Sequence, residues 1–518
     1  MYQLLILIFL FKGIHTITIK NPINQTLIQN DGSYIKNSRH LRKRFRSQKK
    51  SDSICSTKRC KQNPCCSGFV CKGRRKRCVL NAIQMKSLND KQNKQSRTTT
   101  YEPGNLSVRQ NGLLLSKGLK SRIIAISNQA VFYNSPYRND RYHSNIPFHM
   151  LPDAGACFSL KGDLENGWIY VSNSEESNGK GGVYALRFDS DGNVISYQSI
   201  LTGTSRNCGG GKSPWNTWIS CEENGVQGQC FEVDPTGQQK PNMTVLGWNW
   251  DQLPLYNQGY LYGNDLGGGN FESVAYDDRD PMNLHFFVTH DSKKGELRKY
   301  TPSSALLHKP KWEILTNPNN GTMEYLYLYP STNPPTFSWT KDRSLGEQSA
   351  KLYFGGAEGI DVHNGRLYFT SKLEKRLFIL NLDTMEYTVS STEKGAFAYQ
   401  PDQIKFAIRN DRDMKQNSDT PILYFCEDGG LKKSSAIHGR DQNGNYFTIL
   451  EGIGYNSEST GLAFSPNNKF MYVAYQKNPG TLIAIWREDG ESFYGGLVDI
   501  KYHSQEQALS ESNSRQSL

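Results

Sequence analysis

The sequence predicts an all-β fold, a six-bladed β-propeller preceded by a small disulfide-rich module. From about residue 105 to 505, short segments with alternating or aromatic-rich composition recur between turn signals such as Asp-Gly and Asn-Gly. No long amphipathic helix separates them. About 400 residues of short strands in one unit indicate a propeller, because each blade uses about four strands. The clearest segments are Gly167–Asn173, Gly181–Gly192, Leu284–Asp291, Gly365–Ser371, Leu377–Asp383, Pro421–Gly430 and Phe470–Gln476.

The N-terminus carries the features of an exported protein. The apolar run Leu4–Phe11 predicts a signal peptide over residues 1–17, although no basic residue precedes the run, and a buried strand is the alternative. No later segment is long and apolar enough to cross a membrane. Secretion also agrees with four sequons for N-glycosylation, at Asn24, Asn105, Asn242 and Asn320.

Residues 18–54 form a basic linker or propeptide. The run His40–Lys50 contains dibasic sites suited to proteolytic processing, and an unprocessed, solvated charge run is the alternative. The net charge of +12 is concentrated here: Arg39–Arg77 holds fifteen Lys or Arg and one acid, which leaves about −2 for the rest. The high overall charge therefore gives no reason to expect nucleic-acid binding.

Six cysteines crowd into residues 55–78 with the spacing C-x4-C-x4-C-C-x4-C-x6-C. Such density predicts disulfides formed in an oxidising compartment, since so short a segment cannot bury a sufficient core. The spacing resembles the inhibitor-cystine-knot (knottin) family, which implies the pairs Cys55–Cys66, Cys60–Cys71 and Cys65–Cys78. Spacing alone leaves the connectivity open.

The loop Lys72–Arg77 reads KGRRKR and would be a cationic projection of this module. It could bind a sulfated glycan, an anionic lipid or an acidic protein surface. The alternative is a spacer without a partner. Residues 79–104 are a polar linker to the propeller of residues 105–505, and the tail 506–518 is expected to be disordered.

The segment NCGGGKSPWNTWISCEE, residues 207–223, combines a thiol, a glycine run and paired carboxylates. Thiolates and carboxylates are metal ligands of different hardness. Glycines let backbone approach backbone, or an ion, closely. The segment therefore predicts one part of a metal site.

Further acids recur where predicted strands meet turns, and in a propeller they would converge on the central channel. Carboxylates gathered there repel one another unless cations neutralise them. Oxygen ligands suit calcium, and a thiolate adds affinity for a metal such as iron. Any single acid has turn capping as its alternative. The acids are Glu175, Glu222, Glu223, Glu272, Asp291, Glu358, Asp402, Glu427, Asp428 and Glu458.

From about residue 150 to 490 a series of motifs follows in order: NCGGGKSPWNTWISCEE, FES (Phe271–Ser273), HDSKKGELRKYTP, AEGI, PDQI, CEDGG and the block Ser457–Trp486. In their order and content these motifs resemble the PhoX-type alkaline phosphatases. The resemblance implies a six-bladed propeller, calcium ions, a thiolate-bound di-iron centre and hydrolysis of phosphate esters. It makes Cys208 the iron ligand and places Glu223, Glu272, Glu358, Asp428 and Glu458 near the metals; Glu175 and Glu222 complete our expected ligand set, and Glu272 and Glu358 are the expected catalytic residues.

Cysteine counting agrees with a metal-bound thiol. Five cysteines remain after the first six, and an odd remainder leaves at least one unpaired within the chain. Cys208 would be that thiol. Cys221 and Cys230 are close enough in sequence to form a disulfide across a hairpin.

Two positions depart from the family pattern. Gly356 stands where bacterial members usually carry an arginine two residues before the glutamate that matches Glu358, and His290 replaces a glutamate before Asp291. The arginine would bind the substrate phosphate. Residues that could take its place are Lys212, Arg298 and Lys372.

Three functions remain open. The first is a secreted, monomeric, metal-dependent phosphoesterase acting on a phosphate ester or another small anionic substrate. The second is a non-catalytic extracellular protein that keeps the metals and binds glycans or acidic partners through its cationic module. A calcium-dependent lactonase ranks last, because Cys208 has no task in it. The sequence contains no HExxH motif, so a zinc site built from histidines is not expected.

Overall fold

The chain forms two units, residues 1–98 and 99–518, which are treated separately. The computed structural model describes residues 69–72, 77–80, 106–133, 142–160, 167–257, 267–318, 321–392, 397–407, 421–429, 435–441, 443–493 and 501–502. In the first unit, β1 (Phe69–Lys72) and β2 (Arg77–Leu80) form an antiparallel hairpin. The signal peptide, the basic linker and the predicted knottin pairing lie outside the described residues.

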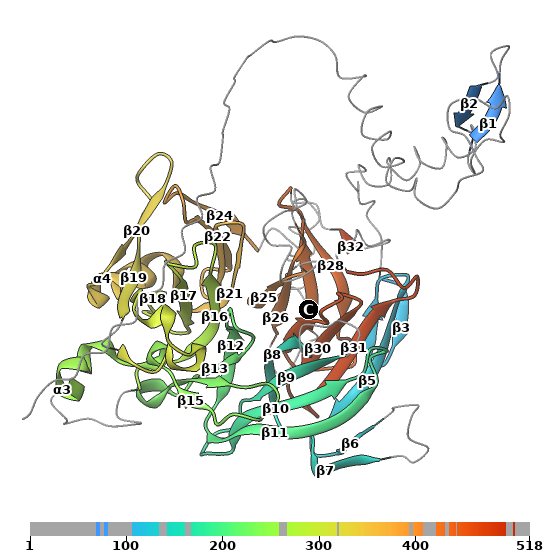
Figure 1. Cartoon of the computed structure of the whole chain (residues 1–518), viewed down its shortest axis with the longest axis horizontal. Helices are drawn as coiled ribbons and strands as arrows, with labels where there is room; N and C mark the ends of the chain where they lie inside the picture. The colour runs from blue at the N-terminus through green and yellow to red at the C-terminus, as the bar shows by residue number, and fades with distance from the viewer. Residues whose placement is uncertain are drawn as a thin grey trace, which may run out of the picture. The chain divides into compact units, whose positions relative to one another are not determined.

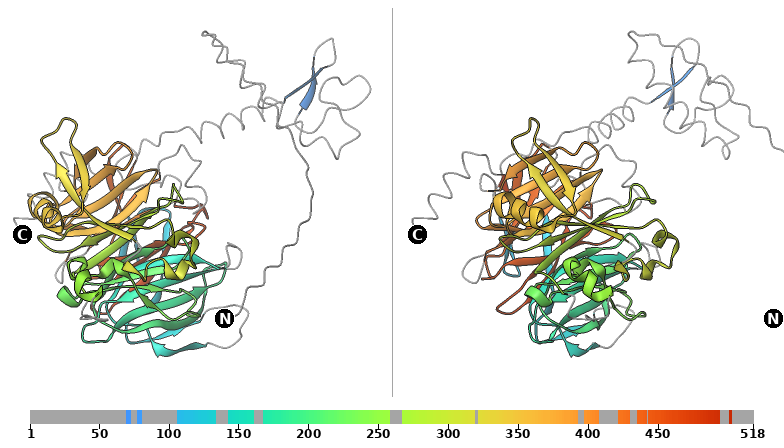
Figure 2. Two further views of the ribbon diagram at one scale, coloured as in Figure 1. Left: turned by 60° about the vertical axis from the view of Figure 1, so that its left-hand side comes forward. Right: turned by 90° about the vertical axis from the view of Figure 1, so that its left-hand side faces the viewer.

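The second unit is a six-bladed β-propeller of antiparallel sheets, as predicted. Figure 2 shows its strands in chain order by colour, from teal and green through yellow to orange and red. Blade 1 comprises β8 (Pro152–Ser159), β9 (Trp168–Ser174), β10 (Gly181–Phe188) and β11 (Val194–Thr204). Blade 2 comprises β12 (Asn207–Lys212), β13 (Trp218–Glu222), β14 (Cys230–Val233) and β15 (Asn242–Met243).

Blades 3 and 4 continue this pattern. Blade 3 comprises β16 (Phe271–Asp277), β17 (His285–His290), β18 (Arg298–Pro302), β19 (Gly321–Tyr329) and β20 (Thr336–Thr340). Blade 4 comprises β21 (Ala357–His363), β22 (Arg366–Ser371), β23 (Arg376–Asn381) and β24 (Tyr387–Ser391). The short helices α3 (Leu253–Asn257) and α4 (Arg343–Ser349) lie in connections of this half (Figure 1).

The last two blades are completed by strands from before blade 1. Blade 5 comprises β25 (Gln400–Phe406), β26 (Leu423–Asp428), β27 (Ala436–Arg440) and β28 (Tyr446–Glu451), extended by β4 (Leu113–Leu115), β3 (Val108–Gln110) and β32 (Lys501–Tyr502). Blade 6 comprises β29 (Ser459–Phe464), β30 (Phe470–Tyr475), β31 (Thr481–Arg487) and β5 (Leu119–Ile126). The antiparallel pairing of β5 with β31 closes the ring. The hairpin of β6 (Ala130–Phe132) and β7 (His143–Pro147) lies beside β11 (Figure 1).

The hydrophobic core lies between the blades and not on the propeller axis. The described residues form six buried apolar clusters, and each joins two neighbouring blades. Trp168 of blade 1 and Tyr472 of blade 6, for example, share one cluster, and Val171 of blade 1 and Trp218 of blade 2 share another. Burial on both faces explains why the strands are nearly continuous in Val, Ile, Leu and aromatics. The axis is left free for polar side chains.

Among the described residues, no helix has the length and apolar character needed to span a lipid bilayer.

Candidate metal centre

The innermost strand of every blade contains a register irregularity near its start. In β8 the pairing with β9 shifts between Pro152 and Gly155, and the other five inner strands shift in the same way. A bulge of this kind re-aims a side chain and increases the local twist. The first residue within each irregularity forms what we call the bulge ring: Asp153, Cys208, Glu272, Glu358, Asp402 and Gly461.

A second set of polar residues lies at the end of the second strand in blades 1 to 5, one position after the residue that pairs with the inner strand just before its irregularity. In blade 2, for example, Asn207 pairs with Glu222, and Glu223 is the next residue. We call this set the rim set. Its members carry a carboxylate in blades 1, 2, 3 and 5 and an ammonium in blade 4: Glu175, Glu223, Asp291, Lys372 and Asp428.

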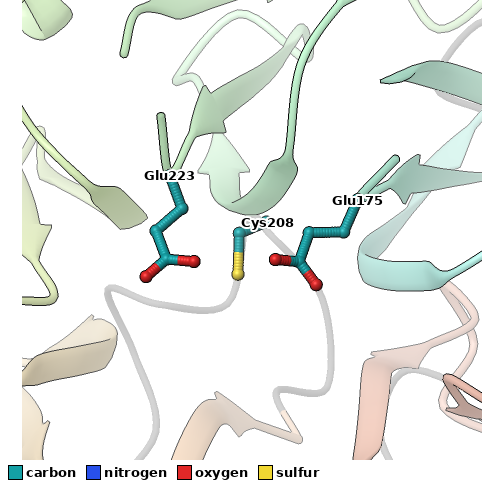
Figure 3. A group of neighbouring side chains, drawn as sticks. All are labelled: Glu175, Cys208 and Glu223. Carbon is teal, nitrogen blue, oxygen red and sulfur yellow. The ribbon is translucent and has the colours of Figure 1, made fainter. Parts of the chain in front are cut away.

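Cys208 lies between two carboxylates of the rim set. Its Sγ and one oxygen each of Glu175 and Glu223 all lie within 4.8 Å of one another. Figure 3 shows both carboxylates turned toward the sulfur. The Cys208 thiol also donates a hydrogen bond to Asp153 Oδ2 at 3.4 Å. Burial and the nearby carboxylate of Asp153 raise the pKa of the Cys208 thiol well above its usual value. A bound cation would reverse this preference and favour the thiolate.

A second group with metal-ligand spacing adjoins the first. It consists of Glu223, Glu272 and Asp291, again with ligand atoms within 4.8 Å of one another. Glu223 belongs to both groups. The first group offers sulfur and oxygen and the second only oxygen, so their chemistry suits two different cations.

The glycine run next to Cys208 allows two inner strands to pack closely. A Cβ on Gly209 would lie 2.2 Å from the carbonyl carbon of Glu272, and one on Gly211 would lie 1.8 Å from Val274 O. Any side chain at these positions would push β12 away from β16. Asn173 fixes the same strand, because its Nδ2 donates to Cys208 O at 2.9 Å and to Gly209 O at 2.7 Å.

The buried carboxylates of the bulge ring share one electrostatic condition. Burial, followed by neighbouring charges, raises the pKa values of Asp153, Glu272 and Asp402 well above the usual range. Burial likewise raises the pKa of Glu358, which the nearby ammonium of Lys372 partly offsets. The carboxyl of Glu223 has a pKa of about 7, raised by burial and lowered in part by Arg206. Without nearby cations the ionised forms of these carboxyl groups are therefore unfavourable, and bound cations would stabilise them.

The cationic side chains of Arg206 and Lys372 lie within this acidic cluster. Arg206 pairs with Glu175 at 3.4 Å and with Glu223, and 42% of its side chain is exposed. Lys372 reaches Glu358 at 3.0 Å, Asp428 at 3.1 Å and Asp291 at 3.5 Å.

Blade 6 places an amide side chain, that of Gln476, directly after its second strand β30, where blades 1 to 4 have a charged residue. Gln476 Nε2 donates to Asp153 Oδ2 at 3.0 Å and to Glu175 Oε2 at 2.8 Å. Glu458, predicted as a ligand, lies beside this position and pairs with Lys477 at 3.2 Å.

Glu222, a predicted metal ligand, lies outside both groups with metal-ligand spacing. Its carboxylate accepts hydrogen bonds from the backbone amides of Ser205 at 2.7 Å and Gln229 at 3.1 Å. Burial raises the pKa of this carboxyl to about 7. Glu427, at the equivalent place in blade 5, also accepts from backbone amides, those of Ala398, Tyr399 and Ala436. Both side chains anchor loops.

Two of the three predicted phosphate ligands lie away from the cluster. Arg298 is fully buried and donates to Glu296 Oε1 at 2.8 Å and to Trp248 O at 2.8 Å, so it cannot meet a substrate. The ammonium of Lys212 lies 5.2 Å from the centre of the Phe158 ring. The third, Lys372, lies in the cluster.

The unusual His290 faces the network around Arg298. Its Nδ1 lies 3.0 Å from Glu296 Oε2, while the next residue, Asp291, joins the rim set. The predicted disulfide between Cys221 and Cys230 is present and links β13 to β14, and Cys157, Cys208 and Cys426 are free among the described residues. Of the sequons, only Asn242 lies within the described residues, half-buried on β15.

Sequence reasoning missed Asp153 and Arg206. A signal for Asp153 does exist: the pair Pro-Asp begins the inner segment of both blade 1 and blade 5, at Asp153 and Asp402. Arg206 directly precedes the segment of residues 207–223, but no motif around it indicates a functional role.

Comparison with known proteins agrees with this architecture. The family profile "Alkaline phosphatase PhoX" matches residues 179–342. The structure of Pseudomonas fluorescens PhoX in complex with vanadate, a transition-state analogue, superposes with a TM-score of 0.54 at 14% identity, covering 77% of this chain and 100% of that one. A gluconolactonase from Xanthomonas campestris gives a TM-score of 0.35 at 9% identity, over 71% and 97% of the two chains. No curated protein sequence matches the chain significantly. The predicted resemblance to PhoX is confirmed over the matched segment, and the propeller fold is confirmed.

Proposed function

We propose that this protein is a secreted, metal-dependent phosphoesterase whose metals bind in the propeller channel around Cys208. The observation that carries the proposal is the grouping of Cys208 with Glu175 and Glu223, whose ligand atoms all lie within 4.8 Å of one another. The match of residues 179–342 to the phosphatase family and the apolar N-terminal run support it. Its substrates are phosphomonoesters or related small anions.

In this proposal the cations occupy two neighbouring positions, which the donor chemistry supports. Glu175, Cys208 and Glu223 would hold iron, because a thiolate favours a transition metal over calcium. Glu223, Glu272 and Asp291 would hold calcium, which prefers oxygen ligands. When bound, such cations neutralise phosphoryl charge and activate the nucleophile.

The side chains around these places have distinct tasks in the proposal. Arg206 is partly exposed beside Cys208, and its guanidinium is well placed to donate two parallel hydrogen bonds to phosphate oxygens. Gln476 and Gln403 orient Asp153 through hydrogen bonds of 3.0 and 2.6 Å. Glu272, one of the two predicted catalytic residues, lies deep in the channel and would hold a proton whenever no cation lies beside it.

The decisive experiment combines metal counting with hydrolysis. Full-length protein from a secreting host is analysed for iron and calcium, and the same sample is assayed with p-nitrophenyl phosphate. We expect both metals and calcium-dependent hydrolysis, and we expect Cys208→Ser to lose iron and activity together. Full occupancy by both metals without hydrolysis of any phosphomonoester would contradict the enzymatic role.

A second function is favoured by Gly356. The arginine that the resemblance leads us to expect at this position is absent. The space around the glycine is also tight, since an added Cβ would lie 3.2 Å from Asp291 Oδ1 and 3.3 Å from Lys372 Cβ. In this alternative the propeller is a metal-bound scaffold and the cationic module binds sulfated glycans. Retention on heparin by the intact chain, but not by a chain starting at residue 101, supports the module's role; equal retention of both counts against it.

A further inference from the structure

Lys372 breaks the chemical pattern of the rim set. The equivalent residues in blades 1, 2, 3 and 5 are carboxylates: Glu175, Glu223, Asp291 and Asp428. In blade 4, Ala357 pairs with Ser371 and the next residue is Lys372. A lysine at this position reverses the charge of one rim residue on an otherwise acidic channel.

The lysine ammonium connects three blades. Its Nζ lies 3.0 Å from Glu358 of its own blade, 3.1 Å from Asp428 of blade 5 and 3.5 Å from Asp291 of blade 3. Only 25% of the side chain is exposed, and Glu358 is 2% exposed. A lysine ammonium has three donor hydrogens. Three carboxylates can take all of them, which leaves none directed at a substrate.

The backbone holds the lysine in this place. Lys372 N donates to Gly356 O at 2.7 Å, and Gly356 N donates to Ser292 O at 2.9 Å, so the segments that follow β17 and β22 are tied through residue 356. Gly356 has a positive φ of 64°, and a Cβ on it would lie against Lys372 Cβ at 3.3 Å. The absence of a side chain at 356 therefore leaves room for the lysine.

We infer that the Lys372 ammonium is a built-in counter-ion that occupies a metal position between Glu358, Asp428 and Asp291, so that bound metals are confined to the Cys208 side of the channel. A calcium ion bonded to these oxygens would need contacts of about 2.3–2.6 Å, which the ammonium excludes both sterically and by charge. The inference rests on the metal-binding part of the proposed function. It also replaces the prediction that Lys372 binds phosphate.

The test is a charge reversal read out by metal content. Full-length wild type, Lys372→Glu and the matched control Lys405→Glu are saturated with calcium, desalted and analysed by elemental analysis and native mass spectrometry. Lys405 is a suitable control because it is similarly exposed and pairs with the carboxylate of Asp361, which belongs to neither group with metal-ligand spacing. We expect Lys372→Glu to retain about one more calcium ion per chain than wild type, and Lys405→Glu to retain the same number as wild type.

A second variant keeps the test decisive if Lys372→Glu does not fold. Lys372→Met leaves buried carboxylates without their cation, so its melting temperature in chelator should fall by about 5 °C and recover with calcium. Lys405→Met should change the melting temperature little. An unchanged calcium content in folded Lys372→Glu, or a Lys372→Met loss that calcium does not restore, overturns the inference. The two failures can be told apart. The proposed function is contradicted if wild-type protein binds no metal and hydrolyses no phosphomonoester, whereas the inference is tested by the difference in calcium content between the variants and wild type.

Discussion

The guanidinium of Arg206 forms an ion pair with the carboxylate of Glu223. Glu223 is also the residue shared by the two groups with metal-ligand spacing. The cation of Arg206 and the candidate metals therefore compete for one carboxylate. With metals bound to Glu223, the guanidinium would be released toward an incoming anion.

Replacing Arg206 by Ala should weaken the binding of phosphomonoesters. Loss of a charge-assisted, two-point contact corresponds to a KM increase of about 10- to 100-fold. Arg206→Lys should restore only part of the affinity, because an ammonium lacks the planar fork. Steady-state kinetics measure both variants, with Arg279→Ala as a control, since Arg279 pairs with Asp277 and Asp383 away from the cluster. An unchanged KM in Arg206→Ala would remove this residue from the substrate site.

Replacing Cys208 by Ser should remove iron selectively. A hydroxyl is a poor substitute for a thiolate toward a transition metal, and we expect iron affinity to fall by at least about 100-fold. Elemental analysis of purified protein gives the iron-to-protein ratio. Cys157→Ser is the matched control, because Cys157 is a free thiol buried in an apolar cluster. Equal iron loss in both variants would mean that the effect is one of folding.

Replacing Arg298 by Met should destabilise the fold without a direct effect on the site. The Arg298 and Glu296 side chains are both fully buried and lie 2.8 Å apart. Removing one partner of a buried pair costs up to about 3–5 kcal/mol, and the remaining contact of Glu296 with Arg343 at 3.2 Å places the expected loss at the lower end of this range. Chemical unfolding followed by fluorescence measures the loss, with exposed Arg376→Met as the control. A variant of unchanged stability but increased KM would reinstate Arg298 as a phosphate ligand.

In the absence of metals, stability should fall as the pH rises from about 4.5 to 7. Burial raises the pKa of Glu223 to about 7 and the pKa values of Glu272 and Asp402 further above their usual range. Across this interval the folded chain keeps protons that the unfolded chain has released, so the free energy of unfolding decreases with pH. Melting curves in chelator from pH 4.5 to 7.5 should show the decrease. Calcium should abolish it, and a melting temperature that rises with pH in chelator would contradict this charge assignment.

The sequence predicted the blades better than the individual ligands, for a physical reason. Strand segments such as Gly365–Ser371 are visible because composition and turn residues are local signals. A ligand position depends on side-chain direction, and neighbouring strand residues point to opposite faces. Glu222 and Glu223 look alike in the sequence, yet one anchors a loop and the other joins the cluster. Asp153 was missed because its equivalence to Cys208 follows from the bulges, which only strand pairing reveals.

The pairing of β5 with β31 also sets an order of events for the growing chain. Ile126 pairs with Thr481, so the earliest strand of blade 6 is made long before its partner. During synthesis this strand stays without its neighbour until the last blade has been translated. Because such distant pairing is slow, the ring and its acidic channel can assemble only late. Metal loading is therefore expected to follow completion of the whole chain, and a nascent protein that stops before blade 6 would present its carboxylates to solvent without enclosing an ion.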